Sequence, residues 1–223
     1  MIYIMNNEAG QNFPVFKGYK ELRIGNFYDG KYEDNIEYLN PYINEYTGMY
    51  LMWKHMDDEI IGVSHYRRFF CMNGYFLKWQ EACSLLNEVD IICTYDYKVW
   101  NGIYANLRSE MWSEKDKLIF DKYCDLLFAG DLGLREWFMC SRGFNPRNMF
   151  VARKSLIDKY FEWIFPILIP LTEKFIREDL HNVDNKRMLA YIVERCFGYW
   201  IHKMNLRTYR LDYFQIDQSW EDE

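Results

Sequence analysis

The sequence has little that would carry the chain into or across a membrane. Its longest apolar run, from Phe161 to Leu171, is too short to span a bilayer and contains Pro166 and Pro170. The N-terminus shows no basic segment followed by an apolar stretch, as a secretory signal peptide would require. We therefore expect a cytoplasmic protein. Exposed aromatic side chains would still allow peripheral contact with the inner face of the cell membrane.

Metal-binding motifs are also missing. The six cysteines form none of the close pairs of a zinc site. His55, His181 and His202 show no metal-ligand spacing either. We expect buried thiols in a reducing compartment, no metal site and no tightly bound cofactor. Mg²⁺ or Mn²⁺ stays an option as a companion of a substrate, but we do not predict that it is required.

Several catalytic signatures are absent as well. The chain contains no glycine-rich phosphate-binding loop, no G-x-S-x-G elbow, no zinc-protease motif and no Asp-x-Asp. The net charge of −6 argues against a nucleic-acid partner, because neutralising a phosphate backbone takes an excess of lysine and arginine. These absences exclude several classes of enzyme and of binding protein.

What the chain does contain is enough material for one well-filled core. With 223 residues, two independent domains would be a tight fit, so we predict a single domain over residues 1–223. Aromatic residues make up 19% of the sequence. Tyrosine and tryptophan combine apolar bulk with a polar tip, which suits sugar recognition as well as packing, and we expect most of them in the core.

Residues 40–70 organise the rest of the chain. Asn40 is a good N-cap, and Pro41 suits the first helical position. Tyrosine, methionine and tryptophan then recur at helical spacing as far as Trp53, which predicts a helix with a broad aromatic face. A charged turn leads into a short apolar strand at Ile60 to Val63. A helix followed by a buried strand indicates an α/β layer.

Further elements predict a mixed central sheet flanked by helices. Strands are expected near residues 2–5, 22–24, 90–94 and 149–152. Helices are expected over residues 77–86, after a cap at Ser113, from Ser155 with a kink or split at the two prolines, and over residues 185–204. Residues 97–112 lack a regular pattern and are expected as an active-site loop.

Four polar residues follow the apolar strand: His65, Tyr66, Arg67 and Arg68. Ligands of open α/β sheets bind at the carboxyl ends of strands, and two arginines with a histidine can hold a diphosphate through charge-assisted hydrogen bonds. Successive strand residues point to opposite faces, so both arginines can face one ligand only if the strand has already ended. The alternative is that one arginine forms a structural ion pair with Glu45 or Asp34. The residues alone leave both open.

Two further positions could contribute polar groups. Glu45 lies at the edge of the aromatic helix face, where a salt bridge to Arg67 or Arg68 is favoured over acid–base catalysis. Asp34 and Asn35 could hydrogen-bond the ribose or uracil of a nucleotide, and would serve equally well as a turn.

The last predicted helix carries Glu194 on the same face as Arg187 and Tyr191. This face is either an ordinary solvent-exposed stripe or the lining of an acceptor cleft. In the second case Glu194 is a general base that deprotonates an acceptor hydroxyl, as inversion at an anomeric carbon requires. Asp184, near the start of the helix, is the fallback base.

Several motifs, in this order, resemble a bacterial family first catalogued as a domain of unknown function. They are Asp34-Asn35-Ile36, N-P-Y-x-x-E-x-T from Asn40, I-G-V-S-H-Y-R-R-F-F ending at Phe70, N-M-F-V-A-R-K from Asn148 to Lys154, the aromatic segment from Tyr160 to Phe165, and Glu194-Arg195. Members occur among capsule, exopolysaccharide and O-antigen assembly proteins, and the family is associated with galactofuranosyl transfer. The resemblance covers most of the chain.

The resemblance implies a GT-A-like, Rossmann-like fold and an inverting transfer of galactofuranose from UDP-galactofuranose to a surface-glycan acceptor, free or lipid-linked. Arg67, Arg68 and His65 would hold the diphosphate, Asp34 and Asn35 the nucleoside, and Glu194 would be the base. Tyr66, Glu45, Asn148 and Arg187 complete the expected substrate-binding set. GT-A enzymes usually place a metal-binding Asp-x-Asp at the comparable strand end, and here the arginines would take its place.

Two other functions stay open. The same scaffold could transfer a pyranose from UDP-glucose or UDP-galactose. The protein could also be a catalytically silent sugar-binding or scaffold subunit, because the chain lacks the Thr-His-Lys that usually follows the first strand in this family.

Overall fold

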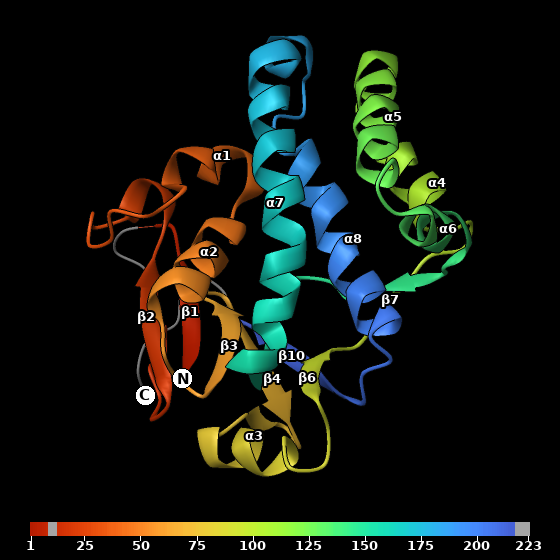
Figure 1. The fold of residues 1–223 in the computed structure, drawn as a ribbon. Coiled ribbons are helices and arrows are strands. Elements are labelled where there is room, and N and C mark those ends of the chain that lie inside the picture. Colours follow the sequence, from red (N-terminus) through yellow and green to blue (C-terminus); the bar gives the residue numbers. More distant parts are fainter. Residues whose placement is uncertain (9–12, 217–223) are drawn as a thin grey trace.

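The chain folds around one mixed β-sheet (Figure 1). The structure, a computed structural model, describes residues 1–8 and 13–216. Eight strands lie in the order β2-β1-β3-β9-β6-β10-β4-β5, and β7 pairs with β8 in a separate small sheet. The strands are β1 Ile2–Asn6, β2 Tyr19–Arg23, β3 Ile60–His65, β4 Arg68–Met72, β5 Tyr75–Phe76, β6 Ile91–Thr94, β7 Tyr97–Lys98, β8 Gly143–Phe144, β9 Phe150–Arg153 and β10 Thr208–Gln215.

The strand directions are mixed. β1 runs parallel to β2 and β3, whereas β9 lies antiparallel between β3 and β6. β10 is parallel to β6 and antiparallel to β4. β4 also pairs back to β3 through Arg68 and His65, so β3, β9, β6, β10 and β4 form a closed ring of five strands. The predicted mixed sheet is confirmed. An open Rossmann-like sheet is not, because the β3–β4 hairpin closes the ring.

Helices cover both faces of the sheet (Figure 1). They are α1 Asn40–Ile43, α2 Tyr46–His55, α3 Trp79–Leu85, α4 Ile103–Ser109, α5 Glu114–Phe128, α6 Leu132–Cys140, α7 Lys154–Glu178 and α8 Met188–Lys203. Side chains alternate between the faces along β1: Tyr3 and Met5 pack in the core beneath α2, α7 and α8, and Ile2 and Ile4 in the smaller core beneath α3.

The helix predicted from Asn40 is interrupted. Asn44 has a left-handed φ of 50°, which ends α1, and α2 begins two residues later. Leu39 holds the N-cap position instead of Asn40, whose side chain donates to Asn44 O (3.0 Å) and Thr47 Oγ1 (2.8 Å). These bonds stabilise the break and leave Glu45 between the two helices, where it lines the cavity described below.

We expected a kink or a split at Pro166 and Pro170; the split does not occur, because α7 runs unbroken over 25 residues. The two prolines lie four residues apart and are both exposed, so the carbonyls that lose a partner are on the solvent side. Phe161 and Phe165 lie in the buried stripe and anchor the helix in the core. Among the described residues no helix, α7 included, combines the length and apolarity needed to cross a bilayer.

Two further differences from the sequence predictions concern the second half of the sheet. The segment 97–112, expected as an irregular loop, contains β7 and α4. β10 has no counterpart among the predicted strands, although it pairs with both β4 and β6 inside the sheet. The predicted cap at Ser113 is confirmed, because its side chain accepts a hydrogen bond from Asp116 N (3.1 Å).

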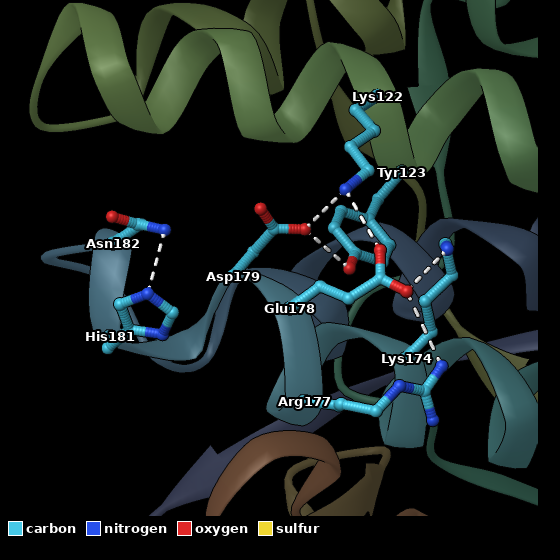
Figure 2. A network of polar contacts seen from close by, with 8 residues as sticks. All are labelled: Lys122, Tyr123, Lys174, Arg177, Glu178, Asp179, His181 and Asn182. Atoms are coloured by element: carbon cyan, nitrogen blue, oxygen red, sulfur yellow. Dashed lines mark hydrogen bonds and ion pairs between the residues drawn. The ribbon is translucent and has the colours of Figure 1, made fainter.

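A polar network ties α5 to the end of α7 (Figure 2). Lys122 donates to Glu178 (3.3 Å) and Asp179 (2.7 Å). The buried Tyr123 donates its hydroxyl to the same Asp179 carboxylate (2.8 Å), and Lys174 supports Glu178 from one turn away (2.7 Å). The network thus joins two helices that are distant in the sequence.

Candidate functional site

A cavity opens at the carboxyl ends of the parallel strands β1 and β3. Its volume is about 470 Å³. The polar residues that line it are Asn7 and Glu8 after β1, Asn44 and Glu45 between α1 and α2, His65, Tyr66, Arg67 and Arg68 at the β3–β4 turn, Arg147 before β9, and Arg187, Tyr191 and Glu194 on and just before α8. This is the edge of the sheet at which ligands of α/β proteins bind.

The polar cluster predicted as a strand end is a tight hairpin. β3 ends at His65 and β4 begins at Arg68. Because the chain reverses here, Arg67 and Arg68 both line the cavity, which two successive residues of one continuous strand could not do.

Arg67 is held by an acidic residue that the sequence did not suggest. Its Nη2 lies 3.2 Å from Glu8 Oε2, and Tyr66 donates its hydroxyl to Glu8 Oε1 (2.8 Å). The predicted pairing of an arginine with Glu45 or Asp34 is therefore wrong for Arg67. A short segment after β1 supplies the partner instead.

Arg68 and Arg147 have no ion-pair partner among residues 1–8 and 13–216, and the buried Nε of each makes no hydrogen bond. Burial, followed by the neighbouring Arg147 charge, lowers the pKa of Arg68, while Glu45 and Glu194 raise it. A guanidinium stays protonated in a protein, so two like charges lie close together here. An anion with several negative charges would complete this arrangement.

The loop before β9 holds Arg147 in an uncommon backbone conformation. Arg147 and Asn148 have φ angles of 74° and 53°, in the left-handed region. Arg147 N donates to Glu194 Oε1 (2.6 Å), and its carbonyl oxygen lies 2.7 Å from His65 Nε2. Two side chains of the cavity therefore position the backbone of a third residue.

The His65 ring makes this contact through Nε2. Burial is the largest influence and lowers the pKa of His65, although Glu45 and the Arg147 carbonyl act in the opposite direction. Because a carbonyl can only accept a hydrogen bond, Nε2 carries the proton and donates. The structure thus gives His65 a positioning contact to the Arg147 backbone, and a contact to a diphosphate stays a prediction.

The sequence predicted a salt bridge from Glu45 to Arg67 or Arg68, but the structure forms neither pair. Glu45 Oε1 accepts a hydrogen bond from Asn148 Nδ2 (2.8 Å), and Asn148 Oδ1 accepts one from Tyr46 OH (3.2 Å). Asn148 is buried and outside the cavity lining. It therefore orients Glu45 from behind, and Arg68 acts on Glu45 only through space.

Glu194 is not on a solvent-facing stripe. Its side chain is 16% exposed, and Oε2 accepts a hydrogen bond from Arg195 Nη1 (2.6 Å). Burial raises the pKa of Glu194, with Arg195 opposing. Arg187 and Tyr191 line the same cavity, in line with the second of the two predictions for this helix face.

A family model described as "Domain of unknown function (DUF4422)" matches residues 5–205. The chain belongs to this family. No curated protein matches it. A solved apo structure of the WbbM bifunctional glycosyltransferase is similar, with a TM-score of 0.77 at 20% sequence identity. The match covers 97% of this chain and 45% of that one, so the DUF4422 chain has the fold of a part of that protein and spans less than half its length.

The structure of the DUF4422 domain places Asp34 and Asn35 outside the cavity lining. Asp34 Oδ1 accepts a hydrogen bond from Tyr50 OH (2.8 Å), and its carbonyl oxygen lies 2.6 Å from His55 Nε2. Asn35 Nδ2 donates to Tyr32 O (2.8 Å). These are the contacts of a turn, so a role in nucleoside binding stays a prediction. Asp184, the fallback base, is exposed and is likewise not part of the lining.

Carboxylates and arginines share the cavity of the DUF4422 domain. In the described part of the chain, no three His, Cys, Asp or Glu side chains come together as a possible metal site. The three carboxylates of the cavity, Glu8, Glu45 and Glu194, are each engaged by donors of the protein itself. Positive charge in this cavity comes from arginine.

Proposed function

We propose that this protein is a glycosyltransferase whose donor is a nucleoside diphosphate sugar. The observation that carries the proposal is the pair Arg68 and Arg147, two cations without an ion-pair partner in the described residues, which line a cavity at the carboxyl ends of β1 and β3. The likeness in fold to part of a bifunctional glycosyltransferase supports the same reaction class.

In this proposal Arg68 and Arg147 bind the diphosphate of a UDP-sugar, with Arg67 and Arg187 beside it. Guanidinium groups bind phosphate oxygens in a bidentate manner. Negative charge grows on the diphosphate as the bond to the sugar breaks, and fixed cations stabilise that charge without reorganising. We therefore expect turnover to persist in EDTA. Loss of activity in EDTA and its recovery with Mn²⁺ would contradict this part of the proposal.

Inversion requires a base on the side of the anomeric carbon opposite the leaving group. We assign this role to Glu194, because its raised pKa brings it closer to the neutral range in which proton transfer is efficient. Each of its carboxylate oxygens accepts one protein hydrogen bond and has a lone pair left for a substrate hydroxyl. Glu45 is the competing candidate in the same cavity. Asp184 is not part of the proposal.

The family resemblance supplies the finer assignment. The donor we propose is UDP-galactofuranose, and the acceptor is a hydroxyl of a capsule, exopolysaccharide or O-antigen glycan, reached at the cytoplasmic side of the membrane. The test is an assay of UDP release with UDP-galactofuranose, UDP-galactose and UDP-glucose as donors in the presence of oligosaccharide acceptors.

Turnover with UDP-galactofuranose is the expected result. Release from the pyranose donors alone would make the protein a hexopyranosyltransferase. Binding of UDP without any turnover would indicate a silent sugar-binding protein, the second alternative, which the missing Thr-His-Lys makes plausible. Failure to bind UDP would overturn the proposal.

A further inference from the structure

The residue that follows the proposed base on α8 is a buried arginine. Arg195 is 5% exposed, and among residues 1–8 and 13–216 it is the one lysine or arginine that is buried. Taking two charges out of water costs free energy that their attraction often fails to offset, so a buried ion pair is a poor device for stability. Arg195 is not among the residues that line the cavity, so its charge acts on a ligand there through a neighbouring side chain.

Three groups hold the guanidinium of Arg195 in place. Its Nη1 donates to Tyr191 O, one turn back on α8 (2.7 Å), and to Glu194 Oε2 (2.6 Å). The guanidinium carbon also lies 4.2 Å from the ring centroid of Phe144, the last residue of β8. Successive side chains of a helix point about 100° apart, so Arg195 reaches Glu194 by lying back along α8. Tyr191 O and the Phe144 ring support that position.

The Glu194 carboxylate is held at both oxygens. Oε1 accepts a hydrogen bond from Arg147 N (2.6 Å), and Oε2 accepts one from Arg195 Nη1. Because the two donors come from different elements, the carboxylate cannot rotate without losing one of the bonds. Both bonds favour the ionised form of the carboxylate. Arg195 therefore helps to fix the orientation of a side chain that lines the cavity.

The charge of Arg195 also acts on Glu194. Burial is the largest influence and raises the pKa of Glu194, and the charge of Arg195 comes next and lowers it. Glu45, from between α1 and α2, raises this pKa as well, and Arg147, from the loop before β9, lowers it. The other titratable or charged groups that line the same cavity are Glu8, His65, Tyr66, Arg67, Arg68, Arg187 and Tyr191. Without Arg195, burial and Glu45 would meet less opposition.

We propose that Arg195 is a positioning residue of the transferase reaction, which fixes the Glu194 carboxylate in the orientation and charge state that accept the proton of the acceptor hydroxyl. As that proton moves to Glu194, the acceptor oxygen bonds to the anomeric carbon, and the bond to the diphosphate breaks with its electron pair left on the diphosphate. The role of Arg195 rests on the proposed function, in which Glu194 is the base.

The pH dependence of kcat/KM for the donor tests the proposal, because its acid limb reports the pKa of the base in the free enzyme. The donor is the one that the wild type turns over among UDP-galactofuranose, UDP-galactose and UDP-glucose. Arg195→Gln removes the charge and should move the acid limb up by about 1–3 pH units, the range in which a nearby opposite charge shifts a carboxyl pKa. Arg195→Lys keeps the charge and should restore most of the wild-type limb. Arg207→Gln, at a surface arginine paired with Asp90, is the matched control and should leave the limb unchanged.

Three further measurements separate this role from a merely structural one. UDP affinity in Arg195→Gln should equal that of the wild type, because Arg195 does not line the cavity. Phe144→Leu keeps the arginine and removes the ring that it lies on, so the acid limb should move in the same direction by less. The carboxyl carbon signal of Glu194 in NMR, identified by its loss in Glu194→Gln, follows the same pKa without turnover.

An acid limb at the same pH in the wild type, Arg195→Gln and Phe144→Leu would overturn the proposal. If Arg195→Gln does not fold, an unchanged limb in Phe144→Leu overturns it alone. Turnover of none of the three donors by the wild type would instead count against the transferase. The NMR signal of Glu194 then decides the effect of Arg195, and an equal titration in the wild type and in the variants would exclude it.

Discussion

Glu194 Oε1 accepts a hydrogen bond of 2.6 Å from the backbone N–H of Arg147 and thereby joins α8 to the loop that carries Arg147 into the cavity. Arg147 has a φ of 74°, a conformation that costs on the order of 1–3 kcal/mol in a non-glycine residue. The bonds from Glu194 and His65 to its backbone offset that cost. The proposed base, Glu194, is thus hydrogen-bonded to the backbone of an arginine of the proposed diphosphate site.

Replacing Glu194 by glutamine should separate catalysis from binding. Glu194→Gln keeps an oxygen that can accept from Arg147 N, so UDP affinity should change little, while loss of the base should lower kcat by roughly 10²–10⁴-fold. Steady-state kinetics and calorimetric titration of UDP measure the two effects. Glu162→Gln, at an exposed position of α7, is the control. If Glu45→Gln abolishes turnover while Glu194→Gln is active, the base is Glu45.

Removing a cation that has no ion-pair partner in the described residues should affect the ligand more than the fold. Arg68→Ala breaks no ion pair, so its free energy of unfolding should stay within about 0.5 kcal/mol of the wild type. UDP affinity should fall roughly 10- to 100-fold, the value of a charge-assisted contact. Arg153→Ala, which removes a surface arginine paired with Glu59, should leave UDP affinity unchanged. Equal losses in both variants would show that general charge, and not the cavity, attracts the nucleotide.

Stability should depend on pH through Glu37. Burial raises the pKa of this carboxyl to about 7 from its ordinary value of 4.5. Between these values the folded state holds a proton that the unfolded state has released, so the stabilisation is present below about pH 4.5 and is lost as the pH rises through 7. Urea unfolding of the wild type minus that of Glu37→Gln isolates this contribution. A difference that stays constant would show that the pKa of Glu37 is unshifted, and one that grows with pH would show that folding lowers it; either would contradict the prediction.

The network between α5 and α7 should matter for stability. Asp179→Ala leaves the buried Tyr123 hydroxyl without its acceptor and should lower the free energy of unfolding by about 1–3 kcal/mol (Figure 2). Arg177→Ala removes a mostly exposed partner of Glu178 and should cost less than about 0.5 kcal/mol. Thermal or urea unfolding compares the two, and equal costs would mean that the Tyr123 bond contributes nothing.

Elements with strong local patterns could be predicted from the sequence. β3, β6 and β9 are short apolar runs that the structure keeps as strands inside the sheet, and α8 follows its buried stripe. β10 was harder to predict, because only Leu211 of its eight residues is buried and the strand is defined by its neighbours. The closed ring depends on the pairing of β3 with β4 through His65 and Arg68, which no local sequence pattern predicts.

Within the candidate site, the residue types could be predicted but their partners could not. The arginines of the β3–β4 turn and Glu194 do line one cavity. Glu8 can be the partner of Arg67 only because β1 and β3 lie side by side. That contact belongs to the tertiary structure and cannot be predicted from a local sequence pattern. The role of Arg147 could not be predicted, because Glu194 and His65 hold its left-handed backbone from distant elements. Asn44 left a readable signal, because asparagine tolerates the left-handed region that ends α1.

A crystal structure of the protein with UDP bound tests the central claim most directly. We expect the diphosphate to lie in the cavity at the ends of β1 and β3, with oxygens within hydrogen-bonding distance of the guanidinium groups of Arg68 and Arg147. A diphosphate bound elsewhere, with both arginines left as they are in the free protein, would contradict it.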